Sequence, residues 1–217
     1  ISINTVHNLG REECGLALRE IQRVSRGKSY VTVDAYRIEL KDRISLSENL
    51  TSAAVRNYLN ANGFIGVGGG RYFTNAIGTT TNGIDVVGTY SWDLAGGELE
   101  TTLGYNYNKT DIDRIAPNPA ALTVIDPTAL RFGRVEIGRF EVGAPRDKFL
   151  FGGIWKSGNW QLSANATRYG EISIRNANPL LDQTFSPQWT LDLSASYKVN
   201  GWNFTVGGDN VLDQYPD

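Results

Sequence analysis

The hydrophobic and polar positions alternate most regularly near the C-terminal end of the chain. From Trp189 to Val199 the odd positions are apolar or aromatic and the even positions are polar. A two-residue period places one apolar and one polar face on a β-strand. Asn200-Gly201, a dipeptide typical of tight hairpin turns, comes next, and the alternation resumes from Trp202 to Val206. The pattern predicts a β-hairpin with strands of about ten residues, the length that a tilted strand needs to cross a bilayer.

The same alternation recurs in the middle of the chain. Further alternating or mostly apolar runs cover residues 83–94, 98–108, 148–155 and 160–167. Turn residues separate them at Ala95-Gly96-Gly97 and Ser157-Gly158-Asn159. We therefore expect an all-β fold: an antiparallel up-and-down meander of about seven or eight long strands that forms part of a transmembrane β-barrel, with a short N-terminal helix.

Residues 29–44 form another predicted strand, but the phase of its alternation changes. Apolar residues occupy odd positions up to Ala35 and even positions from Tyr36 onward. A change of this kind indicates either a β-bulge or the end of a strand that leaves the membrane.

Long and short connections follow one another in turn. The long ones are expected at residues 45–79, 112–146 and 170–188, and the short ones at residues 95–97, 157–159 and 200–201. Outer-membrane barrels sort their connections in this way, with short turns on the periplasmic side and long loops outside. Within the first long connection, Thr51 to Leu59 predicts a short helix and Arg71 to Ile77 a short strand.

The aromatic residues support a membrane interpretation. Four tryptophans lie within three residues of a short turn, and a fifth begins a strand at the opposite end, as expected of aromatic girdles. A carbohydrate-stacking platform is the weaker interpretation. The predicted membrane-interface aromatics are Trp92, Trp155, Trp160, Trp202, Trp189 and Tyr197, and the predicted lipid-facing residues are Leu191, Leu193, Phe204, Val206, Ile84 and Val86.

Residues 1–28 differ from the rest, so two units are expected: residues 1–28 as an N-terminal helical segment, and residues 29–217 as barrel wall. Cys14, Ala17, Leu18 and Ile21 have the spacing of an amphipathic helix, which we predict from Arg11 to Val24. The chain has no methionine and begins with isoleucine, so we expect a processed or truncated piece. The first residues lack the basic and apolar regions of a signal peptide.

Composition and charge narrow the function classes. The formal net charge is −2, which does not favour nucleic acid as a partner. No run of about eighteen apolar residues predicts a membrane-spanning helix. The mean hydropathy of −0.29 is nevertheless compatible with a membrane barrel, because alternating strands average out to a polar value.

Catalytic chemistry finds little support. His7 is the only histidine, and no acidic residue lies at a sequence spacing typical of a catalytic or metal-binding pair. We therefore expect His7 to be exposed. Cys14 is expected to be a small buried hydrophobic residue. Asp111, Asp113 and Asp126 lack the spacing of a calcium loop, and no Gly-x-Ser-x-Gly motif is present. We predict that the chain is not an enzyme, with no catalytic, cofactor or metal site, and that any ligand is recognised by the long loops.

Several stretches resemble the C-terminal barrel region of TonB-dependent outer-membrane receptors. They are the strand from Val33 to Ile44, the segments Phe73 to Ala76 and Thr81 to Asp85, the tripeptide Arg168-Tyr169-Gly170, and the closing segment Gly208 to Pro216. Their order over residues 29–217 is similar to that of the family, whereas residues 1–28 show no resemblance.

The resemblance implies a barrel of about 22 strands in the outer membrane of a Gram-negative bacterium, occluded by a plug. An inner-membrane energy-transducing complex would drive import of a scarce nutrient. A ferric siderophore is the default cargo by family frequency, and saccharides and cobalamin are the alternative cargoes. We expect the chain to depart from the family in three ways: it lacks the plug, it has only about seven or eight strands, and it lacks the final strand. The expected partners are the lipid bilayer, the missing plug and barrel strands, and the energy-transducing complex.

Two other hypotheses remain. The first is a small stand-alone β-barrel, in a membrane or soluble, that binds a ligand without active transport. The second is an outer-membrane hydrolase, which is poorly supported because a single histidine leaves little to activate a nucleophile.

Overall fold

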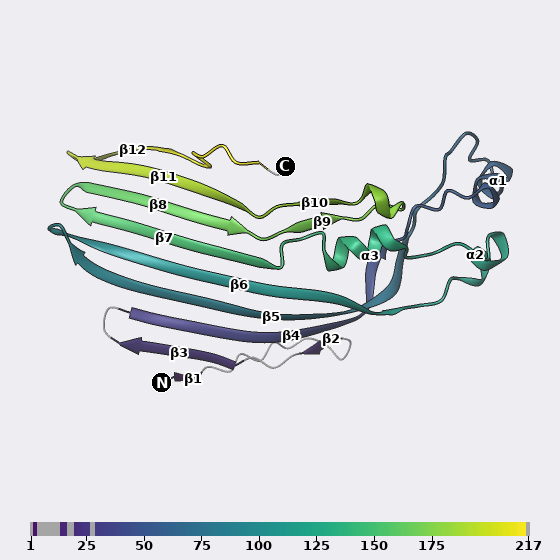
Figure 1. Cartoon of the computed structure of the whole chain (residues 1–217), viewed down its shortest axis with the longest axis horizontal. Coiled ribbons are helices and arrows are strands. Elements are labelled where there is room, and N and C mark those ends of the chain that lie inside the picture. The colour runs from purple at the N-terminus through teal and green to yellow at the C-terminus, as the bar shows by residue number, and fades with distance from the viewer. Residues whose placement is uncertain (1, 4–13, 17–19, 27–28, 216–217) are drawn as a thin grey trace.

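A single large antiparallel sheet forms most of the computed structural model, which describes residues 2–3, 14–16, 20–26 and 29–215 (Figure 1). The strands of this sheet are β1 (Ser2–Ile3), β2 (Cys14–Leu16), β3 (Glu20–Arg26), β4 (Ser29–Leu46), β5 (Phe73–Leu94), β6 (Gly97–Ile115), β7 (Asp147–Ser157), β8 (Trp160–Tyr169), β11 (Gln188–Val199) and β12 (Trp202–Gly208). The remaining elements are α1 (Ala53–Ala61), α2 (Ala120–Ile125), α3 (Arg134–Glu141), the 3₁₀ helix η1 (Pro179–Leu181) and the small hairpin of β9 (Ile172–Ile174) and β10 (Gln183–Phe185).

Each long strand pairs with the next one along the chain. The order is β1-β3-β4-β5-β6-β7-β8-β11-β12, with β2 paired to β4, and every pairing is antiparallel. The predicted up-and-down meander is therefore confirmed. The described strands form an open, curved sheet rather than a closed barrel (Figure 1).

Tight turns join the strands at one end of the sheet. Ala95 and Gly96 both have positive φ, at 51° and 69°, and so do Asn200 and Gly201, at 49° and 82°. Two successive residues with positive φ are the signature of the type I′ turn, whose twist matches that of the flanking strands. The predicted Asn200-Gly201 turn is confirmed.

Strands β4, β5 and β6 extend well beyond the others at the opposite end (Figure 1). They contain 18, 22 and 19 residues, whereas β7, β8 and β11 contain 11, 10 and 12. The expected short strand at Arg71 to Ile77 is not separate, because Phe73 already begins β5. The long connections are therefore shorter than expected and cover residues 47–72, 116–146 and 170–187. We refer to them as the first, second and third loop regions.

The phase change within β4 marks a change of surroundings. Register with β5 continues without interruption from Ser29 to Leu40, and the irregularities come later, between Leu40 and Ser45. No bulge therefore lies at Ala35 and Tyr36. Beyond that point the face that was apolar bears the exposed ion pair between Arg37 and Glu39. Of the two alternatives, the strand leaving its apolar environment is the one that fits.

The N-terminal prediction is wrong over the residues that the structure describes. Cys14–Leu16 and Glu20–Arg26 are strands that pair with β4, not parts of a helix from Arg11 to Val24. The backbone of β4 offers a row of unpaired hydrogen-bonding groups on that side, and an antiparallel strand satisfies them. Residues 4–13 and 17–19, including His7, lie outside the described residues.

A small hydrophobic core lies at the long-loop end. Ala76, Ile77 and Phe132 are buried there, and Ile137 and Phe140 of α3 pack against them. Helix α3 therefore rests on the face of β5 and β6 that bears Ile77. The first loop region contains the predicted short helix as α1, whose N-terminal amide on Val55 donates to the Ser52 hydroxyl. Helices α2 and α3 were not predicted within the second loop region.

Candidate functional site

All twelve predicted membrane-facing residues lie on one face of the sheet. Strand register places Trp92 opposite Leu99 and Leu99 opposite Trp155, and the same row continues through Leu162 to Ala195 and Val206. Further along the same strands, the alternation of β5 and β11 brings Ile84, Val86, Leu191 and Leu193 to the same side. We call this side the apolar face.

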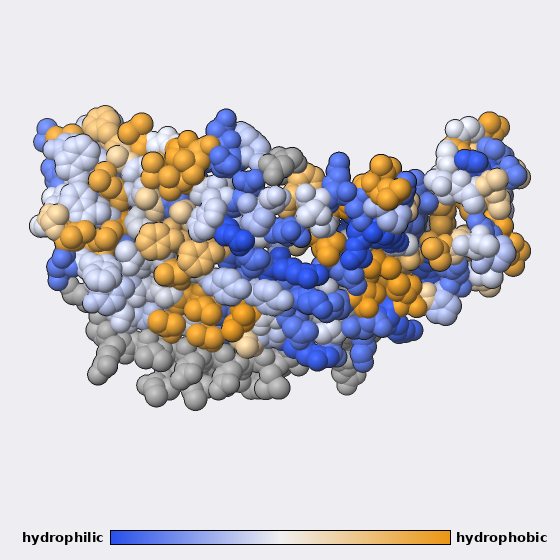
Figure 2. Space-filling model, in the orientation of Figure 1, coloured by the Kyte–Doolittle hydropathy of each residue, from blue (hydrophilic) through white to orange (hydrophobic). Residues whose placement is uncertain are grey.

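The apolar face is exposed although it consists of large hydrophobic residues. Leu193 is 43% exposed, Trp202 71% and Val206 75%. Figure 2 shows many hydrophobic residues over the region of the shorter strands, then a band of hydrophilic residues where β4, β5 and β6 continue, and a further hydrophobic cluster near the far end of these three strands. Soluble monomers rarely expose large contiguous apolar patches.

Aromatic rings gather at both ends of the apolar face. At the short-turn end, Trp160 and Tyr197 have ring centroids 4.6 Å apart, and the Trp155 indole donates to the Leu94 carbonyl at 3.1 Å. At the other end, Trp189 meets Phe149 edge to face at 6.0 Å. The two groups border the apolar face in the manner of two girdles.

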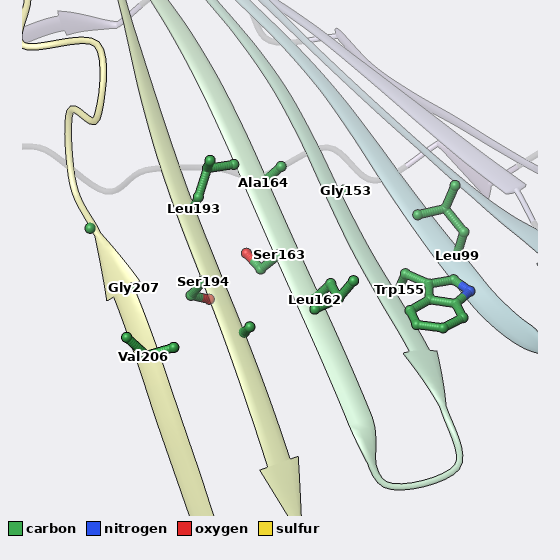
Figure 3. A pocket seen from close by; sticks show the side chains of 12 residues that line it. Leu99, Gly153, Trp155, Leu162, Ser163, Ala164, Leu193, Ser194, Val206 and Gly207 are labelled. Atoms are coloured by element: carbon green, nitrogen blue, oxygen red, sulfur yellow. The ribbon is translucent and has the colours of Figure 1, made fainter.

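A groove of about 570 Å³ indents the apolar face beside β12 (Figure 3). Gly153 and Ala164 leave room there because they lack large side chains, while Trp155, Leu162 and Leu193 stand around them. Its lining contains no charged side chain. The groove suits a hydrocarbon chain and not a polar cargo.

The opposite face of the sheet is polar. One row across it contains Asp34, Asp85, Asn106 and Lys148. The Asn106 amide donates to Asp85, and the Lys148 ammonium lies 4.9 Å from the ring centroid of Tyr169. Asp34 Oδ1 is buried and accepts no hydrogen bond from the residues that the structure describes. We call this side the polar face.

The first and second loop regions are joined by the Glu48 carboxylate. Helix α3 begins after Gly133, which has no side chain to accept a hydrogen bond from the free amides of the first turn. Glu48 Oε2 accepts from the amides of Gly133 at 3.0 Å and Glu136 at 3.4 Å instead. A negative charge at this position also interacts favourably with the positive end of the helix dipole.

Glu136 forms a second link between these two regions. Its side chain is only 5% exposed and accepts from Arg71, whose Nε also donates to the Ser47 carbonyl at 2.9 Å. Arg139, one turn further along α3, reaches the same carboxylate at 3.2 Å. One buried carboxylate thus serves two arginines.

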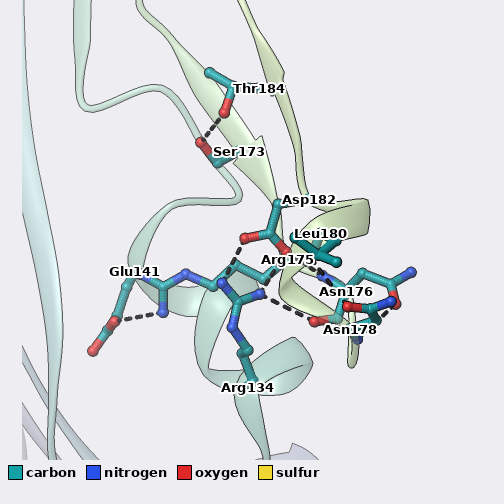
Figure 4. A network of polar contacts seen from close by, with 9 residues as sticks. All are labelled: Arg134, Glu141, Ser173, Arg175, Asn176, Asn178, Leu180, Asp182 and Thr184. Carbon is teal, nitrogen blue, oxygen red and sulfur yellow. Dashed lines mark hydrogen bonds and ion pairs between the residues drawn. The ribbon is translucent and has the colours of Figure 1, made fainter.

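The second and third loop regions are clamped by Arg134 and Asp182 (Figure 4). The two guanidinium nitrogens of Arg134 each donate to one carboxylate oxygen of Asp182 at 2.5 Å, and Arg134 also donates to the Asn176 carbonyl at 3.0 Å. The Asn176 amide donates to Asp182 in turn. Together with the hydrogen bond from the Ser173 amide to the Val142 carbonyl, these contacts connect all three loop regions through α3.

Asp182 makes the clamp sensitive to acid. The Arg134 hydrogen bonds, followed by the Asn176 amide, lower the pKa of Asp182 from 3.8 to about 2. Because the folded pKa lies below the unfolded value, the clamp is fully stabilising above about pH 4 and is lost as the pH falls toward 2. The same ion pair raises the pKa of Arg134.

We expect Asp182→Asn to loosen the third loop region at neutral pH, because the amide retains the shape of the carboxyl but not its charge. Amide hydrogen exchange across Ile172–Phe185 should rise several-fold, and that of β7 and β8 should stay the same. Glu171→Gln, an exposed neutralisation in the same loop region, is the control. Equal exchange in the two variants would show that the clamp does not order the hairpin.

Other candidate residues do not form a site. Asp113 accepts from Thr80, Asp111 pairs with Lys109, and Asp126 accepts from Thr128, so the three acids have separate partners. Among the described residues, no group of three or more metal-ligating side chains comes together. None of the helices in the described part of the chain has the length and apolar character of a membrane span.

Comparisons with solved structures show where this fold occurs. The FrpB iron transporter from Neisseria meningitidis (F3-3 variant) matches with a TM-score of 0.59 at 11% identity, covering 91% of this chain and 27% of that one. The ferripyoverdine receptor of Pseudomonas aeruginosa matches with a TM-score of 0.53 at 15% identity, covering 92% of this chain and 23% of that one. The copper transporter OprC matches with a TM-score of 0.56 at 16% identity, covering 91% of this chain and 25% of that one. The chain therefore spans about a quarter of the length of these structures.

No curated protein matches the sequence. The family model described as TonB dependent receptor-like, beta-barrel, matches residues 17–211, which is most of the chain. Its members are transport receptors of the Gram-negative outer membrane and not enzymes, as predicted. The chain belongs to the TonB-dependent receptor β-barrel family, of whose barrel it forms a part.

Proposed function

We propose that this chain forms part of the barrel wall and of the external loops of a receptor that actively imports a ferric siderophore or a similar metal chelate. The observation that carries the proposal is the division of one sheet into an exposed apolar face and a polar face, with three connected loop regions at one end. A receptor wall needs this arrangement, because one face meets lipid, the other lines the lumen, and the loops meet the cargo.

The apolar face, with its twelve predicted residues, faces lipid in this proposal. The rings near Trp160 lie at the periplasmic boundary and those near Trp189 at the outer one. The groove around Gly153 and Ala164 then lies in the periplasmic half of the bilayer and accepts an acyl chain. The polar face, with Asp34 and Asp85, meets the plug of the complete receptor.

The kind of cargo is suggested by the named neighbours. They are described as an iron transporter, a ferripyoverdine receptor and a copper transporter, so metal uptake is common to the three. Transport against a gradient through a plugged barrel requires energy from the inner membrane, which makes an energy-transducing complex the expected partner.

The test is metal uptake by cells that produce the complete receptor. We expect accumulation of radioactive iron from at least one class of ferric chelate, and its loss when the inner-membrane energy-transducing complex is deleted. Cells without the receptor are the control. Equal uptake with and without the complex would contradict active transport, and no uptake of any iron or copper chelate would contradict the cargo.

A further inference from the structure

Four of the arginines in the three loop regions, Arg71, Arg134, Arg139 and Arg175, differ in how many of their N–H groups contact the protein. Arg134 and Arg71 each use several of their N–H groups on the protein itself, as described above. Arg175 has one carboxylate contact, to Glu141 at 3.4 Å, and Arg139 shares the Glu136 carboxylate with Arg71. A guanidinium has five N–H donors in a fixed plane, so both groups retain donors that these contacts do not use.

These two arginines line the same pocket. It has a volume of about 350 Å³, lies between α3 and β9, and is lined by Val135, Arg139, Gly143, Ser173, Ile174 and Arg175. A volume of this size is within the range of small-molecule sites. The pocket thus combines two cationic side chains with the apolar side chains of Val135 and Ile174.

The surrounding contacts hold Arg175 against α3, the helix that bears Arg139. The stem of Arg175 packs directly on Gly138 of α3, where an added Cβ would come within 2.9 Å of three of its carbons. The clamp between Arg134 and Asp182 fixes the hairpin that bears Arg175 relative to α3, which bears Arg139 (Figure 4). A cation that is already held in place loses less conformational freedom when a ligand binds.

From this geometry we infer that the pocket between α3 and β9 binds an anionic ligand, and that the cargo presents carboxylate or similar anionic groups to Arg139 and Arg175. The inference rests on the proposed function in that the ligand is taken to be the transported chelate. Carboxylates and phosphates match the planar guanidinium fork and its charge, whereas a neutral chelate offers these donors no charge-assisted hydrogen bond.

Citrate and its neutral trimethyl ester are the probes, titrated calorimetrically into the complete receptor in detergent at low salt. We expect citrate to bind and the ester not to bind. Arg139→Gln and Arg175→Gln should each weaken citrate binding about tenfold, the loss expected for one charge-assisted hydrogen bond. Arg56→Gln, an exposed charge on α1, is the matched control and should leave binding unchanged.

Gly138→Ala supplies a variant that keeps both charges. Its methyl group displaces the Arg175 stem, so citrate binding should weaken although the net charge is the same. Absence of citrate binding to the unmodified receptor, equal binding of the ester, or an equal loss in Arg56→Gln would each overturn the inference. A receptor that imports a ferric chelate but fails this titration would refute the anionic pocket and leave the proposed function standing.

Discussion

Replacing Leu193 by arginine is expected to lower the free energy of unfolding from a bilayer by about 2–4 kcal/mol, whereas Ser194→Arg should lower it by about 1 kcal/mol or less. Leu193 lies midway along β11 on the apolar face and is 43% exposed. Ser194 points to the opposite face, toward the lumen of the proposed barrel. An arginine at mid-depth in lipid loses its hydration, but one in the lumen retains it.

Reversible urea unfolding of the complete receptor in phospholipid vesicles measures this difference. The two positions are adjacent in sequence and receive the same side chain, so the change in net charge is the same in both variants. Equal destabilisation by Leu193→Arg and Ser194→Arg would contradict the assignment of the two faces.

Replacing Phe132 by alanine is expected to release α3 from the sheet. Phe132 is 5% exposed and packs with Ala76 and Ile77 in the small core at the long-loop end. Removing a buried phenylalanine side chain typically costs about 3–5 kcal/mol. Because this core is separate from the strand pairings of β7, β8 and β11, the loss should remain local.

Amide hydrogen exchange resolves this local effect. Exchange of the Arg134–Glu141 amides should accelerate by about a hundredfold or more, since each 1.4 kcal/mol corresponds to tenfold, while the strand amides of β8 and β11 are unchanged. Leu130→Ala, a truncation in the same loop region at a side chain that is 66% exposed, is the control. Unchanged protection of α3 in Phe132→Ala would show that other contacts anchor the helix.

The regular strands were predictable because their environment has a simple period. From Trp189 to Val199 every second residue meets the same surroundings, and Asn200-Gly201 marks the turn, so local sequence alone determines register and facing. The same reasoning failed in residues 14–26. Cys14, Ile21 and Val24 are compatible with a helical stripe as well as with a strand, and pairing with β4 decides between them.

The loop assembly could not be predicted because its contacts are distant in sequence. Helix α3 begins at a glycine without a capping side chain, and its cap, Glu48, is 85 residues away from Gly133. The partner of Arg134 is Asp182, 48 residues further on. No local pattern contains such pairs. The sequence indicated that the loops would hold the ligand site, but only the fold brings Arg139 and Arg175 to one pocket.

The central claim, that this sheet is a barrel wall with lipid on its apolar face, is tested most directly by spin labels placed one at a time along β11 from Thr190 to Ser196. The labels would be attached to single cysteines in the complete receptor, with Cys14 replaced by serine, and their collisions with oxygen and with a water-soluble nickel complex would be measured. We predict that labels at Leu191, Leu193 and Ala195 collide mainly with oxygen, because oxygen concentrates in lipid, and that labels at Thr190, Asp192, Ser194 and Ser196 do not. A profile without this two-residue alternation, or with its phase reversed, would contradict the claim.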